Sequence, residues 1–572
     1  MDEINIGAFD TEDDSPERIA ATGSGHGKKL TLIAAQFGGR QSLSHGQVRP
    51  FLRFLSRLPS QTRVYAHNLQ YDLGNIFGGY GTDEKAGRPR LDDMDIRMVG
   101  GRLISARWRN IVFLDSFNLW PMALKKVGQA VGIDKGMMDV RSESYVWTDT
   151  RIVDRAVRAF YSFCRDHGVE APSSTLGGTA VKLWRAGGGA NFQCGAQFPR
   201  EAYYGGRVEL FSTGGRGRIA YTDINSLYPW TMTQAFPNDY YEFTDEARIE
   251  HRRTGHLPGW GVADVEIDVP MMPVPPLPMR RDDGSVYYPV GRLAGKWTTH
   301  EINNAVNMGA RVVKVGETWG SLSAVCFYRD FVDRFYELRR VEADPARKQM
   351  LKLVLNNLYG QLGMSGMITR SCLIKAEDFD DAGNYGGAGV AYGRMALREQ
   401  QMPLPEHVNY LHAAYVTSYA RLRLLWFLRQ VEPGNLIYCD TDSIIFWRGN
   451  ELPFPISDRL GEMKLEGEAD RAFTHAPKMY EFGDEAKAKG VRKDLARQFI
   501  ETGRAEYDLP YKLRESIRFY EARFDASGRQ TFGKNSRPVS VWRRVVKERQ
   551  GSYDRKKLKG TRYIPRFHDE AK

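Results

Sequence analysis

The sequence is poor in cysteine, and its cysteines stand far apart. Among 572 residues there are five, an odd number without a Cys-x-x-Cys pair: Cys164, Cys194, Cys326, Cys372 and Cys439. This pattern argues against a disulfide framework and a structural zinc site, and it predicts a reducing compartment.

Long apolar runs are absent as well. No stretch approaches the ~18 consecutive apolar residues of a membrane span. The amino terminus, MDEINIGAFDTEDD, is acidic and has no apolar core, so it does not resemble a secretory signal. Internal repeats and long low-complexity tracts are also lacking. We therefore expect an intracellular, cytoplasmic protein that does not enter a membrane.

The sequence does contain material for several folded domains and an excess of positive charge. Its length predicts roughly three or four domains, and 42% hydrophobic residues suffice for their cores. Lys and Arg number 81 against 70 Asp and Glu, and the resulting net charge of +11 favours polyanionic partners.

Most of that charge gathers near the C-terminus, where two acidic residues oppose ten basic ones. The basic residues are Arg543, Arg544, Lys547, Arg549, Arg555, Lys556, Lys557, Lys559, Arg562 and Arg566. Trp542, Tyr553 and Tyr563 are interleaved with them, a mixture typical of nucleic-acid grooves. On charge alone, a solvated basic surface explains this tail equally well.

The chain begins with an α/β pattern that extends to about residue 172. Short β-like runs such as Leu30–Ala35 alternate with helical stretches such as Phe51–Leu58. A glycine-rich break at 186–199 indicates a domain boundary, and a proline-rich region at 237–289 predicts an irregular or β-rich insert.

An αα-hairpin is the clearest local prediction. Residues 327–340 have helical periodicity, and Asp344-Pro345 is typical of an N-cap followed by proline in the first turn of a second helix. This second helix should run to Leu358, with Gly360 as its C-terminal stop.

Polar side chains share one face of that second helix. At 3.6 residues per turn, Lys348, Lys352, Asn356 and Tyr359 fall within a narrow arc, while the apolar residues point toward a core. Two lysines one turn apart are ordinary on a solvated face. An asparagine and a tyrosine on the same stripe are less so.

Three carboxylates predict a divalent-metal site. The run LIYCDTDSIIF indicates two β-strands that meet at Asp440 and Asp442, and Asp223 ends the strand-like run RIAYTD. Alone, an Asp-Thr-Asp tip is more often a turn than a metal site. Carboxylates about 4 Å apart repel by about 4 kcal/mol at an effective dielectric near ~20, and Mg²⁺ or Mn²⁺ relieves that repulsion. Two such ions suit nucleotidyl transfer, for which the lysine stripe supplies cations to a triphosphate.

A second set of acids lies near the N-terminus. Asp10 and Glu12 end the first predicted strand. Two more acids follow a polar residue by four positions, which puts each pair on one helical face: Asn68 with Asp72, and Tyr145 with Asp149. Each acid alone is more often a surface residue than a catalytic one.

Three segments resemble motifs A, B and C of family B DNA polymerases. They are DINSLYP from Asp223, KLVLNNLYG from Lys352 and YCDTDS from Tyr438, in the family's order and separation. The resemblance implies that Asp223 and Asp442 hold two Mg²⁺ or Mn²⁺ ions, with Asp440 beside them.

The same resemblance implies nucleotide contacts. Tyr228 would lie under the incoming sugar and exclude a 2′-hydroxyl. The other implied nucleotide-binding residues are Ser226, Leu227, Arg340, Lys348, Lys352, Asn356 and Tyr359. One position departs from the family pattern, because motif B usually has serine where this chain has Asn357. This difference at Asn357 concerns the fidelity with which the enzyme would select nucleotides.

The N-terminal acids resemble the three motifs of DEDD-type 3′–5′ proofreading exonucleases. The implied ligands of two metal ions are Asp10, Glu12, Asp72 and Asp149. Tyr145 would orient the attacking water, and Asn68 and Ser116 would contact single-stranded DNA. Lys135, in IDKGMMD, resembles an additional catalytic lysine of the protein-primed branch.

Several features resemble the protein-primed polymerases of phages and linear plasmids. The chain begins directly at the exonuclease, and the intervals after motif A and after Gly360 leave room for the two inserts of that branch. The second insert aids strand displacement there. Tyr203-Tyr204-Gly205-Gly206 resembles the YxGG template-binding linker. Lys478 and Tyr480 resemble a KxY primer-strand motif, Thr441 joins the implied DNA contacts, and the basic tail falls where a thumb would grip duplex.

The resemblance implies an α/β multidomain fold, with a ribonuclease H-like exonuclease domain and a right-hand polymerase that carries two inserts. The expected divisions are 1–172 exonuclease, 173–206 linker with the YxGG motif, 207–240 palm with motif A, 241–322 first insert and palm extension, 323–360 fingers, 361–405 second insert, 406–510 palm with motif C and KxY, and 511–572 basic thumb.

The expected function is DNA-directed DNA synthesis from dNTPs on a primer-template, with proofreading, strand displacement and a terminal protein as primer. We expect a monomer in the cytoplasm, that of the host cell if the protein is viral. A family B polymerase that needs no terminal protein is the nearest alternative. A nuclease or nucleic-acid scaffold with an inert polymerase half is the alternative of a different class. The Tyr228 gate disfavours RNA synthesis.

Overall fold

The computed structural model describes residues 5–14, 30–77, 94–136, 138–139, 142–190, 192–282, 284–373, 389–392, 395–510, 523–524, 530–531 and 542–548. Most of the basic tail lies outside these residues, so the predicted thumb of residues 511–572 is described only in short strand segments.

A large mixed sheet forms the first part of the molecule, and we call it the N-terminal sheet. Within the described residues its strands follow the order β19 (Gly389–Tyr392), β20 (Met395–Gln401), β18 (Met367–Leu373), β5 (Asp95–Val99), β6 (Arg102–Trp108), β7 (Ile111–Asp115), β4 (Arg63–Ala66), β1 (Ile6–Asp13), β2 (Leu30–Phe37) and β3 (Arg40–His45). Its helices are α2 (Val48–Ser56), α3 (Leu69–Phe77), α4 (Leu124–Ala130) and α5 (Glu143–Asp166).

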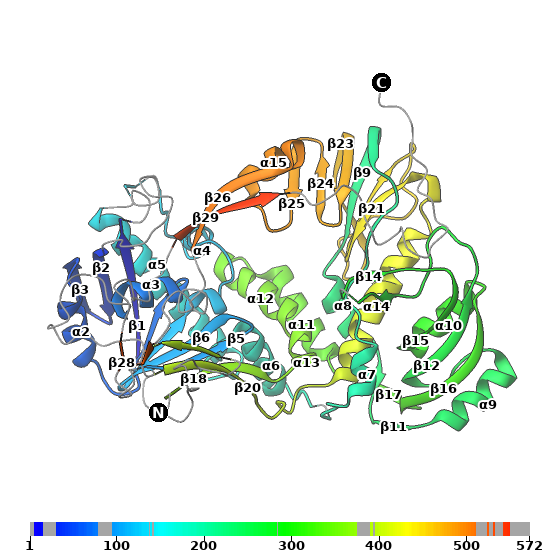
Figure 1. Cartoon of the computed structure of the whole chain (residues 1–572), viewed down its shortest axis with the longest axis horizontal. Coiled ribbons are helices and arrows are strands. Elements are labelled where there is room, and N and C mark those ends of the chain that lie inside the picture. The colour runs from blue at the N-terminus through cyan, green and yellow to red at the C-terminus, as the bar shows by residue number, and fades with distance from the viewer. Residues whose placement is uncertain are drawn as a thin grey trace.

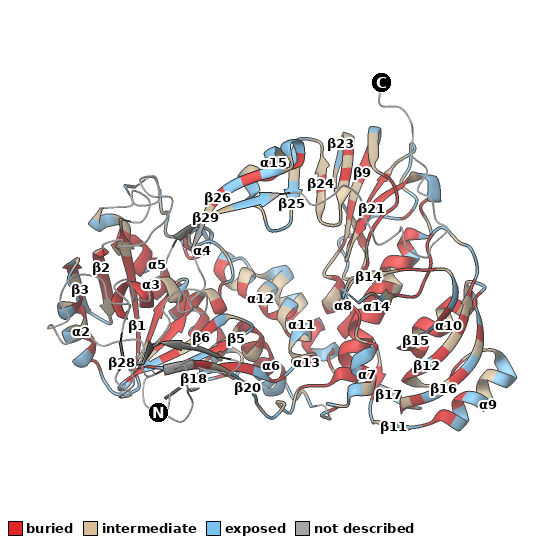
Figure 2. Ribbon diagram, viewed as in Figure 1, coloured by how far each residue is buried: buried red, intermediate tan, exposed pale blue. Residues whose placement is uncertain are grey.

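Parallel pairing at the centre of this sheet positions its functional edge. Strands β1, β4 and β7 run parallel, with Ala8 opposite Tyr65 and Ala66 opposite Asp115. Because parallel strands end at the same edge, the residues that finish or follow all three strands meet there. Figure 2 shows the buried residues of α5 and of the neighbouring strands as one continuous region.

Two β-strands from the middle of the chain extend the same sheet. β18 pairs with β5, with Thr369 opposite Met98, and β20 pairs with β18. Figure 1 shows this hairpin beside the blue strands β5 and β6, although a long stretch of sequence separates them. Sequence reasoning gave no sign of this pairing.

A second sheet, the central sheet, carries the polymerase-like motifs A and C. Its order is β25 (Glu485–Ala488), β24 (Met479–Phe482), β23 (Met463–Ala476), β9 (Gly214–Ile224), β22 (Ser443–Trp447), β21 (Leu436–Asp440) and β8 (Val208–Leu210). Long helix α14 (Tyr410–Leu428) packs against this region and against α7 (Gln197–Glu201) and α8 (Leu227–Met232).

A smaller sheet with two helices forms what we call the four-stranded module. Its elements are β11 (Tyr241–Glu242), α9 (Thr244–Thr254), β12 (Trp260–Val269), β15 (Gly291–Thr298), α10 (Thr299–Asn307) and β16 (Arg311–Ser321). The predicted β-rich insert at 237–289 therefore supplies part of a regular sheet. Short ladders complete the described strands: β10 (Phe236–Pro237) with β17 (Ala324–Val325), β13 (Met279–Arg280) with β14 (Val286–Tyr287), β26 (Arg504–Pro510) with β29 (Trp542–Glu548), and β27 (Arg523–Phe524) with β28 (Gln530–Thr531).

The predicted αα-hairpin is confirmed. It consists of α11 (Arg329–Val341) and α12 (Pro345–Asn357), and the Asp344 side chain caps α12 by accepting from the Arg347 amide at 2.8 Å. The predicted stop at Gly360 is wrong. Leu358 is buried and keeps helical dihedrals, so α13 (Tyr359–Leu362) follows directly and includes Gly360.

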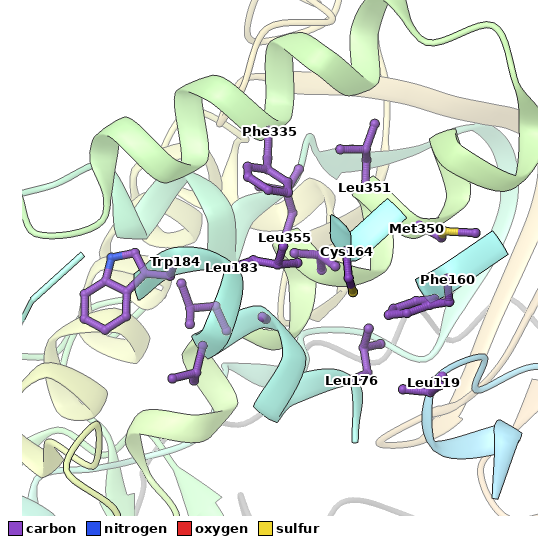
Figure 3. Close-up of a cluster of buried hydrophobic side chains, with 14 of the residues drawn as sticks. Leu119, Phe160, Cys164, Leu176, Leu183, Trp184, Phe335, Met350, Leu351 and Leu355 are labelled. Atoms are coloured by element: carbon purple, nitrogen blue, oxygen red, sulfur yellow. The ribbon is translucent and has the colours of Figure 1, made fainter. Parts of the chain in front are cut away.

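A shared apolar core joins this hairpin to the N-terminal part of the chain. Figure 3 shows Phe335 of α11 and Leu355 of α12 converging with Cys164 of α5 and Leu183 of α6 (Leu176–Ala186). The remaining described helix, α15 (Ala496–Thr502), packs on β25 and β26. No helix among the described residues combines the length and the hydropathy needed to cross a bilayer.

Candidate functional site: two carboxylate centres

The first centre, the central site, forms where β9 meets the tip of the β21–β22 hairpin. The predicted hairpin is confirmed, and β22 pairs with β9 so that Ser443 lies opposite Asp223. The Ile224 amide donates to the Asp442 carbonyl at 2.7 Å. Two strands that are distant in sequence thus bring Asp223 and Asp442 together.

Asp223 and Asp442 sit in an environment that disfavours two unpaired negative charges. Burial, followed by the charges of Asp223 and Asp440, raises the pKa of Asp442 to about 7. Burial also raises the pKa of Asp223 to about 6, although the charge of Lys464 opposes this shift. A divalent cation is the natural partner for such a pair.

Asp440 differs from the other two acids because a lysine lies within hydrogen-bond distance of its carboxylate. Lys478 Nζ lies 2.5 Å from Asp440 Oδ1, and the hydroxyls of Tyr438 and Thr441 donate to the same carboxylate at 3.2 and 3.0 Å. The Lys478 amide in turn donates to the Tyr438 hydroxyl at 2.8 Å. The predicted DNA contacts Lys478 and Thr441 are therefore tied to Asp440 here.

Strand β23 adds charged residues that sequence reasoning missed. Lys464 lies opposite Asp223 in the ladder, its Nζ is 3.8 Å from Asp223 Oδ1, and it also pairs with Glu466. No local motif marks these residues. Their position depends on the antiparallel register between β23 and β9.

An aromatic stack borders the central site. Tyr228 of α8 and Tyr359 of α13 lie parallel, with ring centroids 4.1 Å apart and an interplanar angle of 6°. Ser226 adopts a left-handed conformation, with φ of 48°, immediately before α8 and its buried Leu227. Motifs A and B therefore meet through these two rings. Among the predicted DNA contacts, Tyr480 packs nearby against Tyr438 at 5.3 Å.

Three members of the predicted polar stripe lie on the exposed side of α12, and the fourth, Tyr359, is half-buried at the start of α13. Lys348, Lys352 and Asn356 are exposed, and the charge of Lys352 lowers the pKa of Asp223, although burial outweighs it. Asn357, the residue that departs from motif B, donates to the Leu353 carbonyl of its own helix at 2.8 Å.

Two adjacent arginines of α11 have different partners. Arg340, the predicted nucleotide contact, pairs with exposed Glu337 one turn away, with 2.9 Å between Arg340 Nε and Glu337 Oε2. Arg339 instead donates to the Ser226 hydroxyl at 3.3 Å. Sequence reasoning missed Arg339 because helical periodicity does not reveal which residue faces α8.

The predicted linker motif lies against the tip of the hairpin. A Cβ on Gly206 would approach Thr441 Cγ2 to 2.8 Å, so any other residue here would force the Thr441 side chain to move. Arginine side chains of other elements donate to the carbonyls of this motif: exposed Arg280 to that of Tyr203, and buried Arg421 to those of Tyr204 and Gly205.

The second centre, the N-terminal site, contains a compact acidic cluster. Among the described residues, one group of three brings potential metal-ligand atoms within 4.8 Å of one another: Asp10, Glu12 and Asp149. These are three of the four acids that the resemblance implies as metal ligands in this region; Asp72 is the fourth. Asp10 Oδ2 and Asp149 Oδ1 are buried and have no hydrogen-bond partner among the residues that the structure describes, which fits a site for a cation.

Burial and the charges of neighbouring acids raise the pKa values of the carboxyl groups in this cluster. Burial and then the charge of Asp149 raise the pKa of Glu12 to about 8, and burial with Glu12 raises the pKa of Asp10 well above its usual range. Lys135 Nζ lies 2.6 Å from Asp149 Oδ2 and 4.0 Å from the centroid of the Tyr145 ring. The structure thus brings the predicted Lys135 and Tyr145 to Asp149.

Asp72 joins the same edge by binding β1. Its Oδ1 accepts from the Thr11 amide at 3.0 Å and from the Thr11 hydroxyl at 2.7 Å. The expectation that Asn68 and Asp72 share a helical face is wrong. Asn68 has φ of 68° and precedes α3, because its amide donates to Asp115 Oδ1 at 2.9 Å.

His67 is a further residue at this edge that sequence reasoning missed. Its Nδ1 lies 2.9 Å from the hydroxyl of the predicted DNA contact Ser116, and its Nε2 lies 2.8 Å from the Met122 carbonyl. Burial lowers the pKa of His67 to about 4, so the ring is neutral at pH 7. The only sequence signal for a role of His67 is that it directly follows the strand β4.

Comparisons with known proteins agree with the motifs. Residues 195–389 match the family described as DNA polymerase type B, organellar and viral. The probable DNA polymerase of Ascobolus immersus is 24% identical over 302 residues, 49% of this chain and 24% of that protein. The probable DNA polymerase of Agaricus bitorquis is 24% identical over 349 residues, 52% of this chain and 42% of that protein. The chain thus spans less than half the length of these two relatives.

The fold resembles that of a solved phage enzyme over nearly the whole chain. Phi29 DNA polymerase, from Bacillus phage phi29, has been solved in complex with primer-template DNA and incoming nucleotide substrates. It aligns with a TM-score of 0.65 at 16% identity, covering 96% of this chain and 100% of that one. The predicted α/β multidomain fold class and the resemblance to family B DNA polymerases are confirmed.

Proposed function

We propose that this chain is a DNA-directed DNA polymerase whose central site performs nucleotidyl transfer. The observation that carries the proposal is the meeting of Asp223 and Asp442 beside the Tyr228–Tyr359 stack, with the lysine stripe of α12 close enough to act on Asp223. In the reaction, the primer 3′-oxygen forms a bond to the α-phosphorus of a dNTP, the bond to pyrophosphate breaks, and the hydroxyl proton leaves to solvent.

Asp223 and Asp442 would hold two Mg²⁺ or Mn²⁺ ions. Bound there, the ions supply charge neutralisation for the attacking and leaving oxygens. The raised pKa values of both acids fit this role, since a cation relieves the strain of two buried charges. Asp440 keeps Lys478 oriented, and Tyr228 would bound the sugar pocket and exclude a 2′-hydroxyl.

Positive side chains would bind the nucleotide and the DNA. Lys348 and Lys352 are suited to the triphosphate, together with Arg339 or Arg340. Asn356 and Tyr359 would contact the new base pair, and Ser226 and Leu227 shape the floor of the pocket. Tyr203, Gly205, Gly206, Thr441, Lys478 and Tyr480 would contact primer and template strands.

We further propose a 3′–5′ exonuclease at the N-terminal site. The compact group of Asp10, Glu12 and Asp149 supports it, with two buried oxygens that lack partners. These acids would hold metal ions that activate water for hydrolysis. Tyr145 and Lys135 would orient that water, with Asp72 beside them. Asn68 and Ser116 would bind the single-stranded end.

The division of the chain follows the same proposal. We infer an exonuclease in 1–172, a linker in 173–206, palm in 207–240 and 406–510, inserts in 241–322 and 361–405, fingers in 323–360 and a thumb in 511–572. Strand displacement and priming by a terminal protein extend the proposal, and we infer a monomer. The similarity to phage and organellar polymerases supports these extensions.

A primed single-stranded DNA circle with dNTPs and Mg²⁺ tests the polymerase. Wild type should make product longer than one circle, and Asp442→Ala should make none, because it removes a central-site carboxylate. Asp470→Ala, at an exposed position of β23, is the matched control and should extend normally. Synthesis that stops after one full circle would contradict the proposed strand displacement. A primer that is only shortened would favour the nuclease alternative.

The exonuclease is tested by the double substitution Asp10→Ala and Glu12→Ala. Degradation of a labelled single strand should cease while extension continues, because the two centres belong to different sheets. Loss of both activities would contradict two separate sites. Unprimed template, with and without a terminal protein, separates protein priming from the alternative of conventional priming.

A further inference from the structure

A buried ion pair links α14 of the polymerase-like region to the four-stranded module. Arg421 Nε donates to Glu301 Oε1 at 2.8 Å, and the two side chains are 2% and 1% exposed. The desolvation penalty of two buried charges can exceed their mutual attraction, so such a pair is weak evidence for stability. The contacts of Arg421 with its surroundings therefore call for a functional explanation.

Arg421 holds the backbone of the predicted linker motif. Its Nη1 donates to the Tyr204 carbonyl at 2.9 Å and to the Gly205 carbonyl at 3.0 Å. Glu301 occupies the Nε edge of the same guanidinium, and this fixes the plane of the group. A planar group with several donors in fixed directions suits this task, whereas the single ammonium of lysine does not.

The segment held by Arg421 rests directly on the catalytic hairpin. Gly206 is in close contact with the Thr441 side chain, and the Arg207 carbonyl accepts from the Thr441 amide at 2.7 Å. The chain then enters β8, where Val208 pairs with Asp440. A shift of residues 204–207 would consequently move Thr441 and the two acids that flank it.

We propose that Arg421, oriented by Glu301, is a positioning residue for the carboxylates of the central site. The pair fixes residues 204–207, and those residues fix the tip of the β21–β22 hairpin. Through Glu301, the four-stranded module contributes to polymerase geometry without touching substrate. This inference rests on the proposed polymerase function and assigns a role to residues outside its motifs.

The test compares Arg421→Ala and Glu301→Gln with Thr417→Ala in the full-length protein. Thr417 is a matched control because it is buried on the same helix, and its hydroxyl donates to the Ala413 and Ala414 carbonyls of that helix rather than to the Arg421–Glu301 pair. Misplacement by about 1 Å can cost about 100-fold in rate, and we expect a loss of that order in primer extension by Arg421→Ala.

Two readouts separate positioning from general destabilisation. The Mg²⁺ concentration for half-maximal extension should rise in Arg421→Ala and Glu301→Gln, while exonuclease activity in the same preparations stays within about twofold of wild type. Added guanidinium ion should restore part of the extension rate to Arg421→Ala and none to an Asp442→Ala control. Thr417→Ala should resemble wild type.

Equal losses in Thr417→Ala, or an unchanged Mg²⁺ dependence without guanidinium rescue, would overturn the positioning role. Inactive wild type would instead refute the proposed function. Amide hydrogen exchange decides the inference even then, since Arg421→Ala should accelerate exchange in both 204–208 and 438–443. Exchange that rises only in the first segment, or in neither, contradicts the proposal.

Discussion

Individual acids in the two centres differ in what neutralises them. Asp440 is paired with Lys478, and Asp149 with Lys135. Asp10 and Glu12 have raised pKa values, chiefly through burial and then through neighbouring acids. Since no lysine pairs with Asp10 or Glu12 within the described part of the chain, these are the acids whose charge depends most on a bound cation.

This difference predicts a stability that depends on pH and on metal. Glu12 has a folded-state pKa of about 8 against an ordinary value of 4.5, so its contribution is fully present below about pH 4.5 and is lost as pH rises through about 8. Metal-free protein should therefore melt at a lower temperature at about pH 8.5 than at about pH 6. Mg²⁺ should raise the melting temperature most at the higher pH.

The control for this prediction is the double substitution Asp10→Asn and Glu12→Gln. It removes the coupled charges and should flatten both the pH dependence and the response to Mg²⁺. Calorimetry in chelator and in Mg²⁺ measures both effects. If wild type in chelator melts at a higher temperature at about pH 8.5 than at about pH 6, these acids do not dominate the pH dependence of stability.

The two arginines of α11 allow a second prediction at the residue scale. Arg339 contacts Ser226 at the base of α8, whereas Arg340 pairs with Glu337 on the outside. Loss of this bond to Ser226 should loosen the start of α8, where the proposed nucleotide pocket lies, so Arg339→Ala should raise the dNTP KM by up to about tenfold. Arg340→Ala serves as the matched variant and should change it little. The reverse order in steady-state kinetics would restore the sequence-based assignment of Arg340.

At the scale of elements, α5 joins the N-terminal site to the αα-hairpin. Tyr145 and Asp149 lie near its first turns, and its last turns pack against α11 and α12. There Phe163 meets Phe335 with ring centroids 6.4 Å apart, and Arg347 pairs with Asp166 at 2.6 Å. One continuous helix therefore contacts both parts of the molecule.

The substitution Phe335→Ala should show how much this contact contributes to the free energy of unfolding. Phe335 is 1% exposed, and a Phe→Ala change in a core costs about 3–5 kcal/mol. Urea denaturation followed by tryptophan fluorescence should show a clear drop in the midpoint. Val341→Ala, on the same helix but exposed, should change the free energy of unfolding by less than about 0.5 kcal/mol. Similar effects of the two substitutions would contradict the packing argument.

At the scale of the whole molecule, the N-terminal sheet is built from two distant parts of the chain. Ser371 accepts from the Ile96 amide at 2.7 Å, and Leu397 is buried in the core that also contains Ile96 and Met98. The β18–β20 hairpin, within the proposed second insert, is thus anchored to the proposed exonuclease domain. Both domains take part in one hydrogen-bonded sheet.

We predict that this anchor supports synthesis through duplex DNA. Leu397→Ala removes a buried side chain at a cost of about 2–5 kcal/mol and should loosen the hairpin. Extension on a single-stranded template should change little, while displacement of a downstream strand should slow. Gln400→Ala, exposed on the same strand, is the control. Equal loss on both templates would argue that the hairpin serves synthesis in general.

Local chemistry in the sequence determined much of this protein. Periodicity, turn residues and capping predict three local features that the structure contains. They are the Asp-Thr-Asp hairpin, the αα-hairpin with its Asp344 cap, and the Tyr145–Asp149 helical pair. The motif order indicated the polymerase resemblance and fold class. These features depend on residues only a few positions apart, whose preferences act in the unfolded chain as well.

The tertiary structure alone decided which distant residues meet. Lys464 faces Asp223, Arg339 rather than Arg340 reaches Ser226, and Arg421 holds the linker because of strand registers and helix packing. The same packing explains two wrong predictions: Asn68 lies outside the helix in which it was expected, and Gly360 lies within a helix that it was expected to end. Such contacts arise only when burial and hydrogen bonding bring distant segments together, and sequence spacing does not encode that long-range register.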